Sequence, residues 1–161
     1  MDKTRWSEIQ AVILLAIAIL IFISLITYDS SDLGLFTSKP NYPVKNFAGL
    51  FGAYLAGFFF FSMGFAAYII PVLILTWAVA RFSGIAPQKL YFKMFGTFFL
   101  ILASSTIFSM FGRADNSTCF RFGGTVGLNC SDFLIRYLGR GGAIIVIIVL
   151  FILSILLATE F

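Results

Sequence analysis

The stretch IQAVILLAIAILIFISLITY, residues 9–28, decides the fold class because it contains no charged residue. Twenty residues of α-helix span roughly 30 Å, the thickness of the hydrocarbon core of a bilayer. A signal peptide is the rival interpretation, because Lys3 and Arg5 precede the run. A signal peptide has a shorter apolar core and a small-residue cleavage site, whereas this run ends in YDSSD, residues 28–32. We therefore predict a transmembrane helix.

The composition extends this conclusion to the whole chain. Of the 161 residues, 60% are hydrophobic and 11% are charged, whereas soluble domains are about 25% charged. The net charge is +4, but the basic residues stand singly between apolar runs. Such residues anchor helix ends at the membrane surface more often than they form a nucleic-acid surface. The length suits one compact domain, residues 1–161, without a second soluble domain.

The run at residues 47–82 is too long for one crossing, since its 36 residues would form a helix of roughly 54 Å. Its first part carries small residues at helical spacing, which allow close approach of another helix: Gly49, Gly52, Ala53, Ala56 and Gly57. We predict a short helix over residues 46–57 at the membrane surface, then a span over 58–81. Pro71 should kink that span. A single long, tilted helix is the alternative.

Two more spans are predicted, at residues 91–111 and 143–158. The first contains Ser104, Ser105, Thr106 and Ser109, whose hydroxyls can bond their own backbone or a neighbouring helix. Between the spans, residues 112–142 are more polar. There Ser131 is a plausible N-cap and Gly139 a plausible end of a short amphipathic helix. The predicted fold is an all-α integral membrane protein with four transmembrane helices plus short interfacial or periplasmic helices, and with outer loops at about 29–57 and 112–142.

Four crossings place both termini on the same side of the membrane. With the termini inside, five basic residues lie inside and six outside, so the raw count does not decide. The inner segments are shorter, which makes their basic density higher. Cys119 and Cys130 both lie in one predicted outer loop, a pattern that fits a disulfide in an oxidising compartment. We therefore expect cytoplasmic termini and a Cys119–Cys130 bridge.

The sequence shows no catalytic, cofactor-binding or metal-binding motif. It contains no P-loop, no HExxH, no GxSxG and no CxxC, and no His. No predicted span carries a charged residue at its centre, as ion and proton carriers usually need. Asp29 and Asp32 are too few ligands for a metal, so a capping turn at the membrane surface is the better interpretation.

The order of five motifs resembles a known family. The first span ends in YDSSD (28–32), then NFAGLFGAYLA (46–56) and FAAYIIP (65–71) follow, and GGTVG (123–127) and LGRGG (138–142) come later. This order is similar to the amino-terminal four-helix membrane domain of the FtsK/SpoIIIE family of bacterial DNA translocases. Ser30 stands where the family usually has a Pro. The structural motif residues are Asp29, Asp32, Gly49, Gly52, Gly57, Pro71, Gly123, Gly124, Gly139 and Gly142.

The resemblance implies a function that composition alone does not. It implies a membrane anchor and septum-targeting domain of a cell-division DNA translocase, in the bacterial inner membrane. It also implies divisome partners, a homo-oligomer (hexameric in the full-length family) and a C-terminal ATPase motor. ATP and Mg²⁺ are expected only in that motor, whose Walker motifs are absent here, so this segment should neither be an enzyme nor bind nucleic acid directly. A small four-helix transporter or channel is the alternative.

Overall fold

The computed structural model describes residues 3–83, 90–112 and 116–159. The described elements are helical and form two compact units. Unit 1 comprises residues 1–58 and 68–87, and unit 2 comprises residues 59–67 and 88–161. By length and composition, four helical stretches in the described residues could cross a membrane: Arg5–Ile26, Gly49–Phe82, Lys93–Phe111 and Arg121–Ala158.

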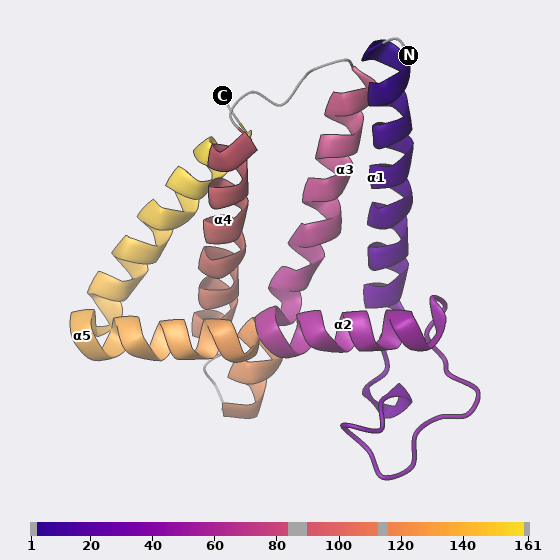
Figure 1. Cartoon of the computed structure of the whole chain (residues 1–161). Coiled ribbons are helices and arrows are strands. Elements are labelled where there is room, and N and C mark those ends of the chain that lie inside the picture. The colour runs from indigo at the N-terminus through magenta and orange to yellow at the C-terminus, as the bar shows by residue number, and fades with distance from the viewer. Residues whose placement is uncertain (1–2, 84–89, 113–115, 160–161) are drawn as a thin grey trace. The chain divides into compact units, whose positions relative to one another are not determined.

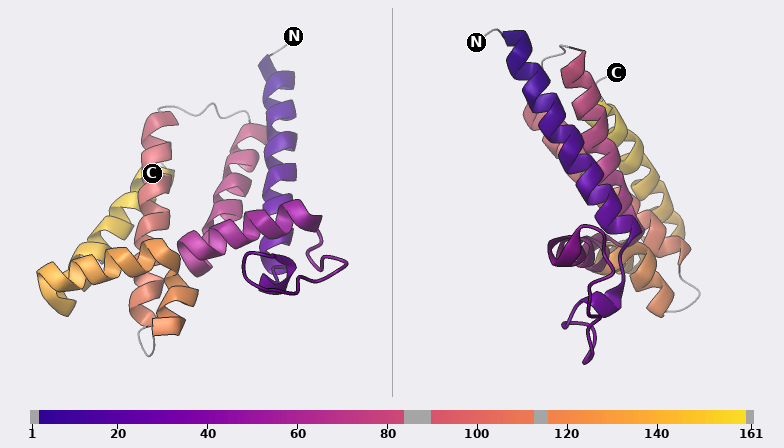
Figure 2. Two further views of the ribbon diagram at one scale, coloured as in Figure 1. Left: turned by 60° about the horizontal axis from the view of Figure 1, so that its bottom comes forward. Right: turned by 90° about the vertical axis from the view of Figure 1, so that its right-hand side faces the viewer.

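Unit 1 is built on a pair of antiparallel helices, α1 (Lys3–Ile26) and α3 (Ile69–Phe82), which lie side by side (Figures 1 and 2). Small side chains, Ala11 and Ala18 of α1 and Ala78 of α3, are fully or almost fully buried. Large apolar side chains of both helices point outward instead, as expected where lipid is the solvent. The first part of α2 (Gly49–Met63), residues 49–58, crosses below the end of α1 at a steep angle (Figure 1).

Unit 2 pairs α4 (Leu90–Phe111) with α5 (Asn116–Thr159). Non-helical backbone angles at Gly124 and Gly139 divide α5 into segments 116–123, 125–138 and 140–159. Segment 125–138 runs across α4, and segment 140–159 returns toward the other end of α4 (Figure 1). There the two backbones meet closely, because a Cβ added at Gly96 would lie 2.6 Å from the amide nitrogen of Ala158.

The predicted split of residues 47–82 exists, but at a different residue. The helix α2 continues through Gly57 to Met63, and the break falls at Gly64, which has a φ of 58°. A short 3-10 helix, η2 (Gly64–Tyr68), then leads into α3. Pro71 does not kink the middle of a span. It lies in the first turn of α3, where a missing N–H removes no helical hydrogen bond.

The predicted polar loop at 112–142 is largely helical. Residues 116–142 belong to α5, and residues 113–115 lie outside the described part of the chain. Ser131 is not an N-cap, because its hydroxyl lies within the helix and donates to the carbonyl oxygen of Leu128 at 2.9 Å. The helix end predicted at Gly139 is a bend within α5, since Gly139 has a φ of 68°. Polarity suggested a loop, but a helix lying across a bilayer surface is polar on one face.

Candidate functional site

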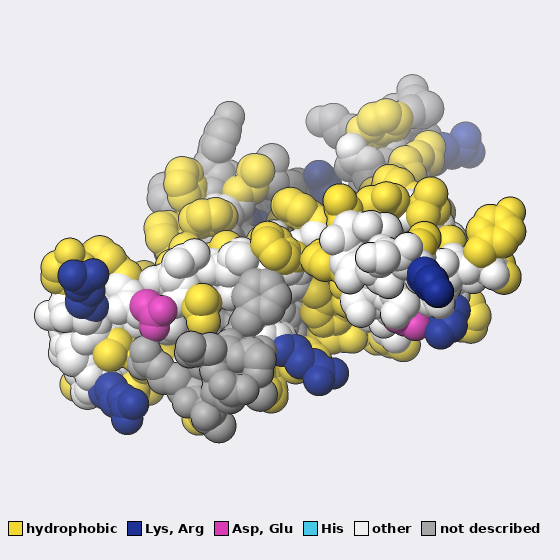
Figure 3. All heavy atoms as spheres, turned by 90° about the horizontal axis from the view of Figure 1, so that it is seen from below, with side chains coloured by type: hydrophobic (Ala, Val, Ile, Leu, Met, Phe, Trp, Pro, Cys, Tyr) yellow, Lys and Arg dark blue, Asp and Glu magenta, His cyan; other side chains and the backbone are white. Residues whose placement is uncertain are grey.

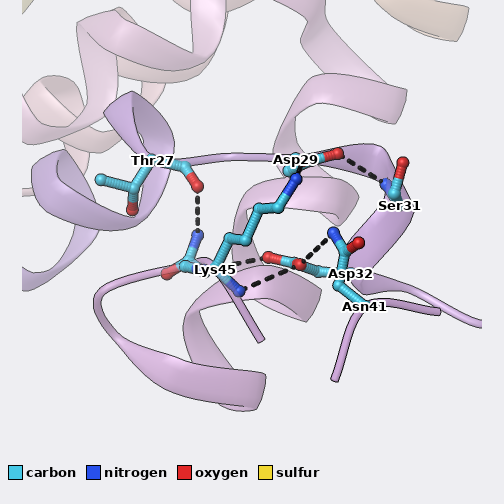
Figure 4. Close-up of polar contacts among 7 residues, drawn as sticks. Thr27, Asp29, Ser31, Asp32, Asn41 and Lys45 are labelled. Carbon is cyan, nitrogen blue, oxygen red and sulfur yellow. Dashed lines mark hydrogen bonds and ion pairs between the residues drawn. The ribbon is translucent and has the colours of Figure 1, made fainter. Parts of the chain in front are cut away.

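A buried polar group of unit 1 is the Asp32 carboxylate, at the end of η1 (Ser30–Asp32) just after α1. The side chain is 2% exposed. It accepts hydrogen bonds from the Asn41 side-chain amide at 2.9 Å, the Lys45 backbone N–H at 3.1 Å and the Asn46 backbone N–H at 2.9 Å (Figure 4). Asp32 therefore fixes the path of the loop that leads into α2.

Asn46 extends this hydrogen-bond network to the end of α1 and to the turn before α2. Its side-chain amide donates to the carbonyl oxygens of Ser24 at 2.8 Å and Thr27 at 3.4 Å, which lack helical partners at the end of α1. Its side-chain oxygen accepts from the Ala48 N–H at 3.0 Å, at the start of α2. One buried asparagine thus caps the end of α1 and closes the turn that precedes α2. This role of Asn46 was not predicted from the sequence. An Asn just before a helix start was the available signal.

Asp29 has a smaller part in the same corner. Its carboxylate accepts from the Ser31 N–H at 2.9 Å, and its other oxygen lies 3.1 Å from the Lys45 ammonium (Figure 4). The exposed Lys45 side chain makes this a surface ion pair, which contributes little to stability. The sequence predicted a capping turn here, and Asp29 is the N-cap of η1.

Both carboxylates ionise more readily than usual. Burial would raise the pKa of Asp32, but the hydrogen bonds from Asn41, Lys45 and Asn46 outweigh it, so the pKa is lowered. The pKa of Asp29 is lowered by the Ser31 N–H and the Lys45 ammonium. Asp32 is thus a charged structural group. No three His, Cys, Asp or Glu side chains of the described residues come together as a metal site requires.

The small-residue stripe of α2 is buried in unit 1. Gly52 lies against Asn46 and Ser24, and a Cβ there would be 2.5 Å from the Asn46 side-chain oxygen. Gly57 lies against the Leu33 side chain, also at 2.5 Å from an added Cβ. Gly49 has open space around it. Gly52 and Gly57 are therefore closely packed, whereas Gly49 is not.

In unit 2, α4 and α5 pack against each other through serines and glycines. The Ser105 hydroxyl donates to the Gly123 carbonyl oxygen, and the Ser109 and Ser131 hydroxyl oxygens lie 3.2 Å apart. An added Cβ at Gly123 would be 2.6 Å from the Ser105 carbonyl oxygen. The other two hydroxyls of the α4 cluster bond the backbone of their own helix, Ser104 to Leu100 and Thr106 to Leu102. The cluster therefore serves packing, as the sequence suggested.

The two bends of α5 differ in their surroundings. Gly124 has a φ of 62° and is packed against the end of α2, since an added Cβ would be 2.5 Å from the Met63 amide nitrogen. Gly139 has a φ of 68° with nothing within 4 Å, and an added Cβ at Gly142 meets only Leu138 of the same helix, at 3.1 Å. Among the described residues, neither Gly139 nor Gly142 therefore packs against another helix.

Cys130 carries a free thiol. The structure therefore does not support the predicted bridge with Cys119, whose side chain lies outside the described residues. The prediction assumed a loop, whereas Cys119 and Cys130 both belong to the helix α5.

The chain is similar in sequence to a known protein family and to several of its members. Residues 3–161 match the model of the 4TM region of DNA translocase FtsK/SpoIIIE. Relatives named DNA translocase FtsK include those of Pseudomonas putida, 29% identical over 90% of this chain, and Rickettsia prowazekii, 27% identical over 96%. The protein from Pseudomonas syringae pv. tomato is 31% identical over 90% of this chain.

These alignments cover 18% to 20% of the length of the relatives, so the chain spans about a fifth of the proteins it matches. No solved structure matches the chain. The family match extends over nearly every residue. It includes residues 49–58, residues 125–138 and the loop around Asp32, and it agrees with four stretches able to cross a membrane. The chain therefore belongs to the family of the 4TM region of DNA translocase FtsK/SpoIIIE.

Proposed function

We propose that this chain is the membrane anchor and septum-targeting domain of a cell-division DNA translocase. In this role it tethers a C-terminal ATPase motor and so couples chromosome segregation to division. The observation that carries the proposal is the family match over residues 3–161 together with four candidate spans. The greater length of the relatives named DNA translocase leaves room for a motor beyond the matched region.

The location and partners follow from the same role. The chain lies in the bacterial inner membrane at the division septum, with both termini cytoplasmic, so that a motor joined to the C-terminus can reach DNA. It contacts membrane lipid and divisome proteins and forms homo-oligomers, as a ring-shaped motor would require. The membrane domain itself binds neither nucleic acid nor a cofactor; ATP and Mg²⁺ belong to the motor.

A transporter has less support. The hydroxyl cluster of α4 was the feature that favoured it, and Ser104, Ser105, Thr106 and Ser109 all have partners inside the protein. Conducting hydroxyls would instead face a polar, water-filled path.

A fluorescent protein fused after Phe161 tests the proposal in dividing cells. We expect a band of fluorescence at the division site, whereas a fusion carrying only residues 1–28 should label the membrane evenly. Even labelling by the whole chain would contradict septum targeting. ATP turnover by the purified chain would contradict the assignment of catalysis to a separate motor.

A further inference from the structure

Unit 2 contains an apolar groove at the Gly139 bend. Its volume is about 400 Å³, within the range of small-molecule pockets. The last turns of α4 contribute Ile107 and Met110, segment 125–138 contributes Ile135, and the first turns of segment 140–159 contribute Ile144 and Ile148. The groove is thus enclosed by three helical segments that belong to one unit.

One cation stands at this otherwise apolar groove. Arg140 lines it and is exposed, and no carboxylate of the described residues pairs with it. The space-filling view from below shows Lys and Arg side chains, with an acidic side chain near them, next to hydrophobic ones on the left of Figure 3. An arginine beside an apolar channel offers a phosphate a charge-assisted, bidentate partner and offers an acyl chain a dry surface.

The position of Arg140 agrees with the depth of a lipid headgroup. Tyr137, which is 70% exposed, lies just before the bend, and the aliphatic run from Ala143 begins just after it. Tyr side chains are enriched at the membrane–water boundary. Arg140 therefore lies at the junction of a polar and an apolar layer, with the groove extending from it along α4 and segment 140–159.

We propose that this groove binds one anionic phospholipid, with the phosphodiester on Arg140 and an acyl chain along Ile107, Ile144 and Ile148. Each buried methylene contributes favourably to such binding, and basic sites between membrane helices are known to select anionic headgroups. The occupied groove would join α4 to segment 140–159 at the end where these two helices diverge.

Binding is tested with the purified full chain in neutral detergent, by native mass spectrometry with phosphatidylglycerol and phosphatidylcholine of the same acyl chains. We expect the chain to retain phosphatidylglycerol and to release phosphatidylcholine at lower collision energy. Arg140→Gln should weaken phosphatidylglycerol binding about tenfold and remove the preference between the two lipids. Arg136→Gln is the matched control, since Arg136 is exposed but does not line the groove, and it should leave both unchanged.

The acyl-chain part is tested by Ile144→Trp, which fills the groove and should weaken the binding of both lipids. Glycerol phosphate in millimolar excess should not displace the lipid, because a free phosphate lacks the acyl chain. Equal losses in Arg140→Gln and Arg136→Gln would overturn the proposal by showing general charge attraction. Displacement by glycerol phosphate, unchanged binding in Ile144→Trp, or a second copy of the chain that shields Ile144 from lipid would overturn it too.

Discussion

The two units contain the same kind of element but fix it by different means. Each has a helical segment that runs across its long helices, residues 49–58 in unit 1 and residues 125–138 in unit 2 (Figure 1). In unit 1, the buried charge of Asp32 and the amide of Asn46 connect the loop, α1 and α2. In unit 2, glycines and serines let α4 and α5 touch backbone to backbone. A hydrogen-bonded corner should respond to charge, and a close-packed one to side-chain size.

The largest expected effect is the difference in stability between variants at the two bends of unit 2, Gly124 and Gly139. Gly124→Ala forces an L-residue into backbone angles that essentially only glycine adopts, which costs about 1–3 kcal/mol, and also pushes a Cβ into the backbone of Ser62 and Met63. We expect a total loss of about 4 kcal/mol in the free energy of unfolding, measured by SDS titration of mixed micelles. Gly139→Ala, with similar backbone angles but open space, should lose only about 1–3 kcal/mol. Equal losses would show that contact at Gly124 is unimportant.

The next effect tests the corner of unit 1. Asp32→Ala leaves three hydrogen-bond donors without their acceptor, and we expect a loss of about 3 kcal/mol in the free energy of unfolding. Asp29→Ala is the control, because it removes only a surface ion pair and a local bond, and it should cost much less than Asp32→Ala. If the two variants were equally stable, the buried carboxylate would not organise the corner.

The pH dependence of local stability should also differ between the two units. The folded-state pKa of Asp32 is below its usual range because the hydrogen bonds outweigh burial, and the unfolded value is about 3.9. Its stabilisation is therefore complete above the unfolded pKa and is lost as the pH falls from about 4 through the folded pKa. Hydrogen exchange should show faster opening of residues 49–58 at pH 3 than at pH 6.

The Ser105–Gly123 contact supplies an internal reference for this pH series, because it involves hydroxyl and carbonyl groups that do not titrate. Asp32→Asn should abolish most of the pH dependence of residues 49–58. Asp29, whose pKa is lowered too, accounts for the remainder. A pH response that persists in full in Asp32→Asn would contradict the role of this carboxylate.

The smallest effect concerns the hydroxyl pair of unit 2. Ser109→Ala removes one partner of the 3.2 Å contact with Ser131, but the Ser131 hydroxyl keeps its bond to Leu128. We expect a loss of about 1 kcal/mol or less in the free energy of unfolding. Ser109→Leu should cost more, since Gly123 lies against the Ser109 Cβ. The ratio of the two losses measures how far size outweighs hydrogen bonding here.

The sequence predicted the number of spans, the all-α class and the family, because these depend on long apolar runs and on the order of motifs. It placed the break of residues 47–82 at Gly57 instead of Gly64, since helix length requires a break but does not choose among several glycines. A Cβ at Gly57 meets a side chain, whereas Gly64 adopts a positive φ and lies against the backbone of Phe122. Such tertiary contacts cannot be recognised in a single sequence. The same holds for Asn41, which reaches Asp32 across a loop.

The proposed anchor has both termini in the cytoplasm, because a motor attached on the other side could not reach DNA. Single cysteines at Tyr42, Tyr137 and Ala86, in a Cys119→Ser, Cys130→Ser background, test it directly. Tyr42 and Tyr137 are exposed, and Ala86 belongs to the predicted cytoplasmic loop outside the described residues. With a membrane-impermeant maleimide on intact spheroplasts, we expect labelling at positions 42 and 137 and none at 86 until the membrane is opened. Labelling at 86 but not at 42 and 137 would contradict the account.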